Sequence, residues 1–128
     1  MSTIPRNLRF TTTHEWVREE TDGVVTIGIT DHAQELLGDL VFVELPDIGA
    51  EINAGDECCV VESVKAAADV YAPVDGQIAE VNTALQAQPE LINQDPFGQG
   101  WLWKMQLAKD ADLSALLDAD GYSSVIAD

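Results

Sequence analysis

The chain has 128 residues, of which 23 are Asp or Glu and 6 are Lys or Arg, giving a net charge of −17 at pH 7. Hydrophobic residues make up 46 %, too many for a disordered acidic tail, and the length suits one domain, which we expect to span residues 1–128. The acidic charge argues against nucleic acids and anionic membrane surfaces as partners and favours basic protein faces.

The first elements in chain order are short strands followed by a helix. Val24–Ile29 is β-rich, and a strand also begins at Glu15–Val17. From Asp31 the apolar residues recur with a helical period, and Asp31 with Gln34 has the spacing of a capping box. We therefore predict a helix at Asp31–Leu37, with the following glycine ending it.

Five more β-rich runs follow, separated by Gly, Pro and Asp residues. They are Leu40–Leu45, Cys58–Val64, Asp69–Ala72, Gln77–Asn82 and Trp101–Leu107. Asp75–Gly76 predicts a hairpin-type turn, and Pro89–Ile92 a helical turn. An amphipathic helix is expected to start near Asp110, and its apolar face would hold Ala111, Leu113, Leu116 and Leu117. The pattern predicts a mostly β protein of two packed antiparallel sheets or a flattened barrel, with short helices in the middle and at the C-terminus.

The two cysteines, Cys58 and Cys59, are adjacent in a predicted strand. Neighbours in a strand point to opposite faces, so we expect reduced thiols rather than a disulfide. Neither they nor the two histidines, 18 residues apart, have the spacing of metal ligands, and no metal is expected. The N-terminal ten residues lack a signal-peptide core and a transit-peptide pattern, which favours a bacterial cytoplasm over a mitochondrial matrix.

Lys65 is the first lysine in the chain, and the next is Lys104. Gly55 precedes it by 10 residues and Gly76 follows it by 11, so two strands of similar length are expected to meet in a turn near this lysine. A lysine acts as a nucleophile when it is buried or lies beside a cation, whereas the charged neighbours here are acids. The residues alone therefore leave two roles open, an attachment point and a solvated turn lysine.

Five ordered motifs narrow this choice. They are THEW at 13–16, GITDHAQELLGDLVFVELPDIG at 28–49, VESVKAAADVYAPVDGQIAEVN at 61–82, PELIN at 89–93 and DPFGQGWLWKM at 95–105. Together they resemble the glycine cleavage system H protein over nearly the whole chain. The resemblance implies the barrel-sandwich fold of lipoyl and biotinyl carriers, with lipoic acid in amide linkage to Lys65 and Glu62, Ser63, Val64 and Ala66 forming the attachment turn.

The same resemblance implies a non-catalytic carrier in glycine catabolism and one-carbon metabolism, and the high net charge favours a monomer. Its partners would be glycine decarboxylase (P protein), an aminomethyltransferase (T protein) and dihydrolipoyl dehydrogenase (L protein), together with lipoyl-attaching enzymes. The carrier would bring an aminomethyl group from the pyridoxal-phosphate decarboxylase to the tetrahydrofolate-dependent transferase and then be reoxidised. We further hypothesise that Glu15 and Asp69 line the resting arm and hold its cationic amine. The alternative is that Glu15 is a solvated strand residue and that Asp69 caps a turn.

Three rival interpretations remain at this stage. One is a lipoyl or biotinyl domain of a larger acyltransferase or carboxylase, which would usually follow a flexible linker that this chain lacks. Another is an independent enzyme, for which no paired base and nucleophile, metal set or phosphate loop is present. The last is an H-like protein that relays lipoyl groups to other complexes.

Overall fold

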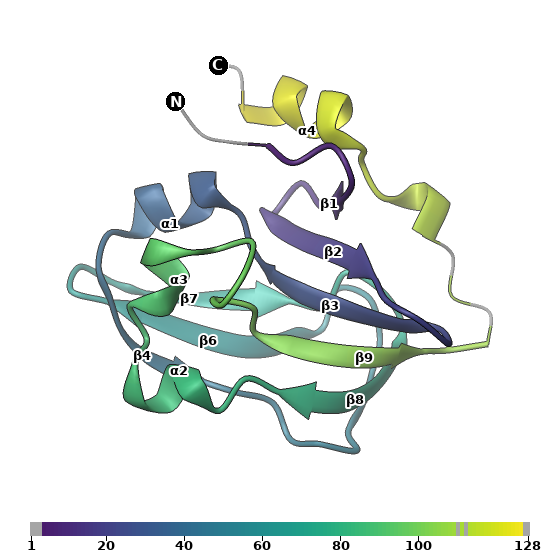
Figure 1. Ribbon diagram of the computed structural model, residues 1–128, viewed down its shortest axis with the longest axis horizontal. Coiled ribbons are helices and arrows are strands. Elements are labelled where there is room, and N and C mark those ends of the chain that lie inside the picture. The colour runs from purple at the N-terminus through teal and green to yellow at the C-terminus, as the bar shows by residue number, and fades with distance from the viewer. Residues whose placement is uncertain (1–3, 110, 112, 127–128) are drawn as a thin grey trace.

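Two antiparallel sheets pack face to face in the computed structural model, which describes residues 4–109, 111 and 113–126 (Figure 1). The larger sheet has the order β1-β2-β3-β9-β8-β5 and the smaller the order β4-β6-β7. The larger comprises β1 (Arg9–Phe10), β2 (Glu15–Glu19), β3 (Val24–Ile29), β9 (Trp103–Leu107), β8 (Gly76–Val81) and β5 (Glu51–Ile52). The smaller comprises β4 (Leu40–Glu44), β6 (Glu57–Ser63) and β7 (Ala67–Tyr71). The expected mostly β architecture of two packed antiparallel sheets is confirmed.

The main core lies between the sheets, because alternate residues of each strand point inward. Ile27 and Ile78 from the larger sheet and Val43 and Val61 from the smaller are all buried in one apolar cluster. Cross-strand pairing of Val43 with Val61 places both on the inner face of the smaller sheet. The side chains on its outer face, such as Glu44 and Phe42, are therefore exposed.

Short helices cover the remaining edges of the sheets. They are α1 (Asp31–Leu37), α2 (Ala84–Ala87), α3 (Leu91–Gln94), the 3-10 turn η1 (Leu113–Ala115) and α4 (Ala119–Ile126). The bounds of α1 are as predicted, but its N-cap is not Asp31: the Thr30 hydroxyl accepts a hydrogen bond from the Ala33 N–H at 3.2 Å. Asp31 instead accepts a bond from the Gln34 side chain at 2.8 Å. The predicted end is confirmed, because Gly38 has φ +83°.

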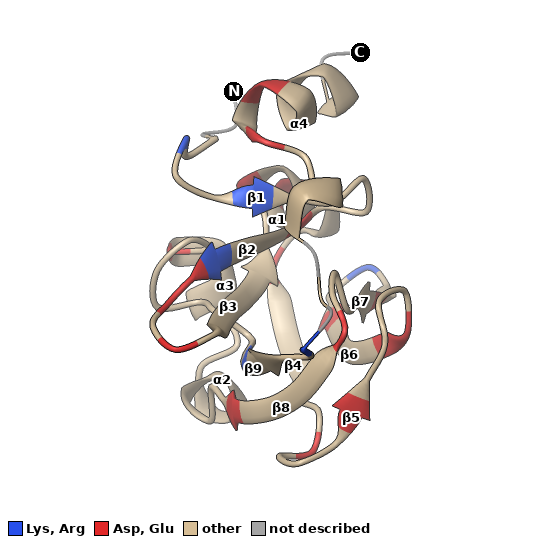
Figure 2. Ribbon diagram, turned by 90° about the vertical axis from the view of Figure 1, so that its right-hand side faces the viewer, with Lys and Arg blue, Asp and Glu red and all other residues tan. Residues whose placement is uncertain are grey.

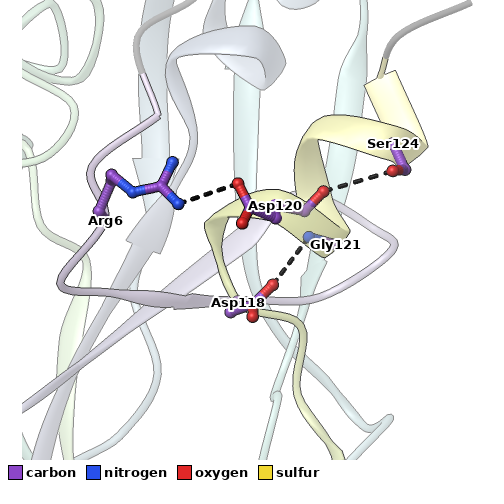
Figure 3. A network of polar contacts seen from close by, with 5 residues as sticks. All are labelled: Arg6, Asp118, Asp120, Gly121 and Ser124. Carbon is purple, nitrogen blue, oxygen red and sulfur yellow. Dashed lines mark hydrogen bonds and ion pairs between the residues drawn. The ribbon is translucent and has the colours of Figure 1, made fainter.

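The C-terminal helix α4 lies over the outer side of β1 and β2. Phe10 and Trp16 from the sheet are buried with Tyr122 of α4 in a second apolar cluster, and the Phe10 and Tyr122 rings stack with their centroids 4.8 Å apart. An Arg6–Asp120 ion pair of 3.0 Å joins the N-terminal segment to α4, and Asp118 caps the helix by accepting from the Gly121 N–H (Figure 3).

The predicted start of the C-terminal helix is wrong. Asp110 lies outside the described residues, and η1 and α4 replace one continuous helix. The reason is backbone pairing: Leu117 exchanges two 2.8 Å hydrogen bonds with Phe10 and so joins β1 as a bridge. A residue in an antiparallel bridge has no helical backbone, so the helix begins beyond it.

The hairpin-type turn predicted at Asp75–Gly76 is also wrong. β7 and β8 belong to different sheets, so the chain crosses between layers here instead of folding back. Gly76 begins β8, and a Cβ at this position would lie 2.5 Å from the Gln106 carbonyl oxygen of β9. This glycine therefore allows close approach of two strands.

Candidate functional site

Lys65 lies at the exposed tip of the hairpin that joins β6 to β7, as the sequence predicts. The Ser63 side chain holds the turn, because its Oγ accepts from the backbone N–H groups of Lys65 and Ala66 at 3.1 Å each. The Ser63 N–H also donates to the Ala66 carbonyl at 2.8 Å. Val64 is exposed and Glu62 half-buried, so the five residues 62–66 form a tight turn that presents one amine.

The Lys65 amine rests on the end of α1. Its Nζ donates to the Leu36 carbonyl oxygen at 3.2 Å. The last carbonyls of a helix have no partner within the helix, and a cation is favourable there. Gly38 leaves room for the lysine stem, because a Cβ at Gly38 would lie 3.2 Å from Lys65 Cε.

An apolar slot of about 160 Å³ opens beside this amine, between α1 and the β6–β7 hairpin. Leu36, whose carbonyl holds the amine, is part of its wall. The apolar lining residues are Ile29, Ala33, Leu36, Leu37, Val61, Ala68 and Val70. Thr13, His14, Glu15 and Asp69 complete the lining, so the slot combines a hydrophobic wall with two carboxylates.

Glu15 is a buried carboxylate, 2 % exposed, with no cationic partner among the described residues. Its Oε1 accepts from the hydroxyls of Thr11 and Thr13 at 2.6 and 2.5 Å, and its Oε2 accepts from the Tyr71 N–H at 3.2 Å. Burial raises the pKa of this carboxyl, and the hydrogen bonds oppose the rise in part. A cation entering the slot would therefore find an oriented negative charge that lacks a counterion.

His14 and Tyr122 belong to a polar chain behind Glu15. His14 Nδ1 lies 2.7 Å from the Tyr122 hydroxyl, which lies 2.6 Å from Thr30 Oγ1. Burial, and then the neighbouring His32, lower the pKa of His14. This chain links α4 and the start of α1 to β2, and the sequence does not reveal it because its members are far apart along the chain.

Asp69 lies at the slot, but its side chain shares the outer face of the smaller sheet with Val60 and Glu44. Asp69 pairs with Val60, and Val60 with Glu44, so these three side chains lie on the outer face of the smaller sheet. Asp69 lines both the slot and a second depression of about 530 Å³, which we call the acidic groove. Its acidic residues are Glu44, Asp47, Glu57 and Asp69.

The two cysteines are free thiols in β6, where a bulge between Glu57 and Cys59 breaks the alternation. Cys59 is buried in the main core, Cys58 is half-buried against that core, and both line the acidic groove. Burial, and then the nearby Asp56, raise the pKa of Cys58 to about 12, and burial likewise raises that of Cys59. Thiols held protonated in this way are poor nucleophiles.

Within the part of the chain that the structure describes, no group of three or more His, Cys, Asp or Glu residues is placed to hold a metal ion. No helix within these residues is both long enough and apolar enough to cross a membrane.

Comparison with known proteins places this geometry in a family. The sequence model of the glycine cleavage H-protein matches residues 8–128. The chain is 56 % identical over 128 residues to the glycine cleavage system H protein of Cronobacter sakazakii, covering 100 % of this chain and 99 % of the relative. It is 58 % identical over 126 residues to that of Alteromonas mediterranea, with 98 % of each chain covered. The crystal structure of a glycine cleavage system H protein from Mycobacterium marinum superposes with a TM-score of 0.87 at 44 % identity, over 94 % of this chain and 97 % of that one.

Proposed function

The chain belongs to the glycine cleavage H-protein family, and from this premise we propose that Lys65 carries a lipoyl group in amide linkage. The chain acts as the carrier of the glycine cleavage system. The observation that carries the assignment to Lys65 is its position: a lone exposed amine at the tip of a two-stranded hairpin, next to an apolar slot. The turn residues Glu62, Ser63, Val64 and Ala66 hold that amine in place.

The proposed carrier works with the P, T and L proteins in turn, and lipoyl-attaching enzymes act on it first. When bound, the lipoyl group supplies the disulfide and dithiol chemistry by which an aminomethyl group is taken up and passed on. This chain holds the anchor of the arm in place, shelters the arm and presents it to each enzyme. Tethering gives each transfer a high effective concentration within a docked complex.

The slot supports this assignment because its lining fits an aliphatic arm. Its walls from α1, β6 and β7 are apolar, and it begins beside the Leu36 carbonyl that the Lys65 amine contacts. An alkyl chain lying there would be removed from water at a gain of roughly 25 cal/mol for each Å² buried. Acylation removes the charge of the amine and so weakens its contact with Leu36, which frees the stem to turn toward the slot.

Glu15 and Asp69 are our proposed polar lining for the arm. No described residue gives the buried Glu15 carboxylate a counterion, and a cationic amine on the arm would provide one. Asp69 is exposed on the neighbouring strand and lines the slot from its edge. We therefore assign the principal contact with the amine to Glu15 and a weaker, solvent-screened one to Asp69.

We propose a single lipoyl-carrier domain over residues 1–128, monomeric and working in a bacterial cytoplasm. The relatives named above are bacterial proteins that match over nearly their whole length, which supports one carrier unit. The alternative, a protein that relays lipoyl groups to other complexes, gains no support from these relatives.

The test of the attachment site is peptide mapping by mass spectrometry after expression in cells supplied with lipoate. We expect one lipoyl group on Lys65 and none on Lys104 or Lys109. Lys65→Arg should abolish both lipoylation and glycine cleavage with purified P, T and L proteins, whereas Lys104→Arg and Lys109→Arg should retain both. A lipoyl group found on Lys104, or full turnover by Lys65→Arg, would contradict the proposal.

A further inference from the structure

Large apolar side chains are exposed around the Lys65 turn. Among the described residues six large hydrophobic residues are exposed, and four of them lie near this turn. We call these four the apolar patch: Leu36 (61 % exposed), Val41 (55 %), Phe42 (51 %) and Val64 (69 %). The other two, Ile48 and Val125, lie in other parts of the chain. Clustered exposure of this kind marks interaction surfaces in otherwise polar proteins.

The residues of the patch are brought together because the hairpin tip packs on the link between α1 and β4. The Val64 N–H donates to the Asp39 carbonyl at 3.1 Å, and Lys65 Nζ reaches the Leu36 carbonyl. Phe42 pairs with Glu62 at the end of β6, and a β-bulge between Leu40 and Phe42 breaks the alternation of β4. That bulge explains why the neighbours Val41 and Phe42 are both exposed.

Acidic residues border the patch, and Lys65 is the cation within it. The acids are Glu35, Asp39, Glu44 and Glu62, all exposed or half-buried. The described arginines and the other two lysines lie on the N-terminal segment, β1, β2, β9 and the segment after β9. In Figure 2 the blue segments of β1 and β2 lie to the left of the view and β7 lies to the right. The face around Lys65 is thus apolar at its centre and acidic at its rim.

We propose that the apolar patch is the docking surface for the mouth of an enzyme active site that receives the Lys65 arm. This inference rests on the proposed function. Because the arm is anchored inside the patch, an enzyme that draws the arm into its active site brings the rim of that site against these residues. The fitting partner surface is apolar next to the opening and basic around it.

A second copy of this chain is a poorer occupant of the patch. Two copies meeting through this face would bring two acidic rims together, each on a molecule of charge −17. Burying four apolar side chains on each side is far less than the area that stable dimers bury. The same modest size suits a carrier that must leave one enzyme for the next, because a small interface dissociates quickly.

The test compares a Val41→Thr/Phe42→Thr double variant with Ile48→Thr, which removes an exposed apolar side chain from outside the patch. All proteins are lipoylated in vitro, and only fractions carrying one lipoyl group on Lys65 by mass are used. The rate of each purified partner enzyme is then measured against carrier concentration. We expect the double variant to raise the KM for the carrier about tenfold with little change in kcat, and Ile48→Thr to leave both unchanged.

Two controls keep this test separate from the test of the attachment site. Reduction of the lipoyl group by dithiothreitol should proceed equally in all three proteins, because it needs no docking. If the lipoylated wild type turns over and the double variant has the same KM for the carrier as Ile48→Thr, the docking surface alone is overturned. If the wild type sediments as a dimer and the double variant as a monomer, the patch binds a second copy of this chain, which would also overturn the docking surface. Absence of lipoyl from Lys65 in the wild type would overturn both proposals.

Discussion

At the scale of single residues, Glu15 is a carboxylate that the fold removes from water without giving it a cation. Its raised pKa means that the protonated form is favoured in the folded state relative to the unfolded chain. The stability this group contributes is therefore present below the unfolded pKa of 4.5 and is lost as pH rises through the folded value. Wild type should thus lose stability relative to Glu15→Gln as the pH rises above 4.5 and through the raised pKa of Glu15.

This prediction is measured by urea unfolding of both proteins across that range. A glutamine keeps an acceptor for the Thr11 and Thr13 hydroxyls at every pH but points its NH2 group at the Tyr71 N–H. That cost does not vary with pH, so the pH dependence of the difference reports the charge. Glu19→Gln removes the same charge from an exposed position on β2 and reports the general effect of lowering the net charge. A constant difference between wild type and Glu15→Gln, once the Glu19→Gln effect is subtracted, would show that burial does not disfavour the carboxylate.

Glu15 is buried and Asp69 is exposed, so substituting the two residues should affect an amine-loaded arm to different extents. Glu15→Gln should shorten the half-life of the loaded protein in isolation by about tenfold, corresponding to loss of roughly 1.4 kcal/mol of contact with the cation. Asp69→Asn should change it much less, because that side chain is exposed and screened. Release of the amine from each purified protein is the measurement. Equal half-lives in wild type and Glu15→Gln would remove Glu15 from the lining.

At the scale of elements, β-rich runs predict the longer strands, whereas the two-residue strands β1 and β5 are not predicted. The run Cys58–Val64 corresponds to β6 at Glu57–Ser63, shifted by one residue at each end. The turn at Lys65 is also predictable, since glycines bound two strands of similar length. What local pattern cannot supply is the assignment of strands to sheets, which is why Asp75–Gly76 suggests a hairpin where the chain in fact crosses between layers.

The contacts around the candidate site likewise divide into those between residues close in sequence and those between residues far apart in it. Lys65 and its turn are contiguous in sequence and can be identified from it. The donors that hold Glu15 combine the nearby Thr11 and Thr13 with Tyr71, which lies 56 residues away and arrives through the packing of the two sheets. Likewise the Thr30 cap is bonded to Tyr122 across 92 residues. Contacts of this range depend on topology, so sequence periodicity alone does not indicate them.

At the scale of the whole molecule, the net charge of −17 is accompanied by few ion pairs among the described residues. Within the described part of the chain, Arg6–Asp120 and Arg18–Glu20 are the ion pairs within 4.0 Å, and the first is highly exposed. In the acidic groove Glu44, Asp47 and Glu57 face one another with Asp69. Folding gathers these like charges, so the folded state carries a repulsion that the expanded unfolded chain relieves in part.

Salt should therefore stabilise this protein. Raising NaCl from about 10 mM to about 150 mM shortens the screening length from about 30 Å to about 8 Å, so the free energy of unfolding should rise by on the order of 1 kcal/mol. Urea titrations at the two concentrations measure it. The Glu44→Gln/Asp47→Asn/Glu57→Gln variant should be more stable than wild type at low salt and gain less from added salt, because screening has fewer close repulsions to relieve. An equal gain in both proteins would place the repulsion outside the groove, and a fall in stability with salt would show that attractive pairs dominate the electrostatics of the fold.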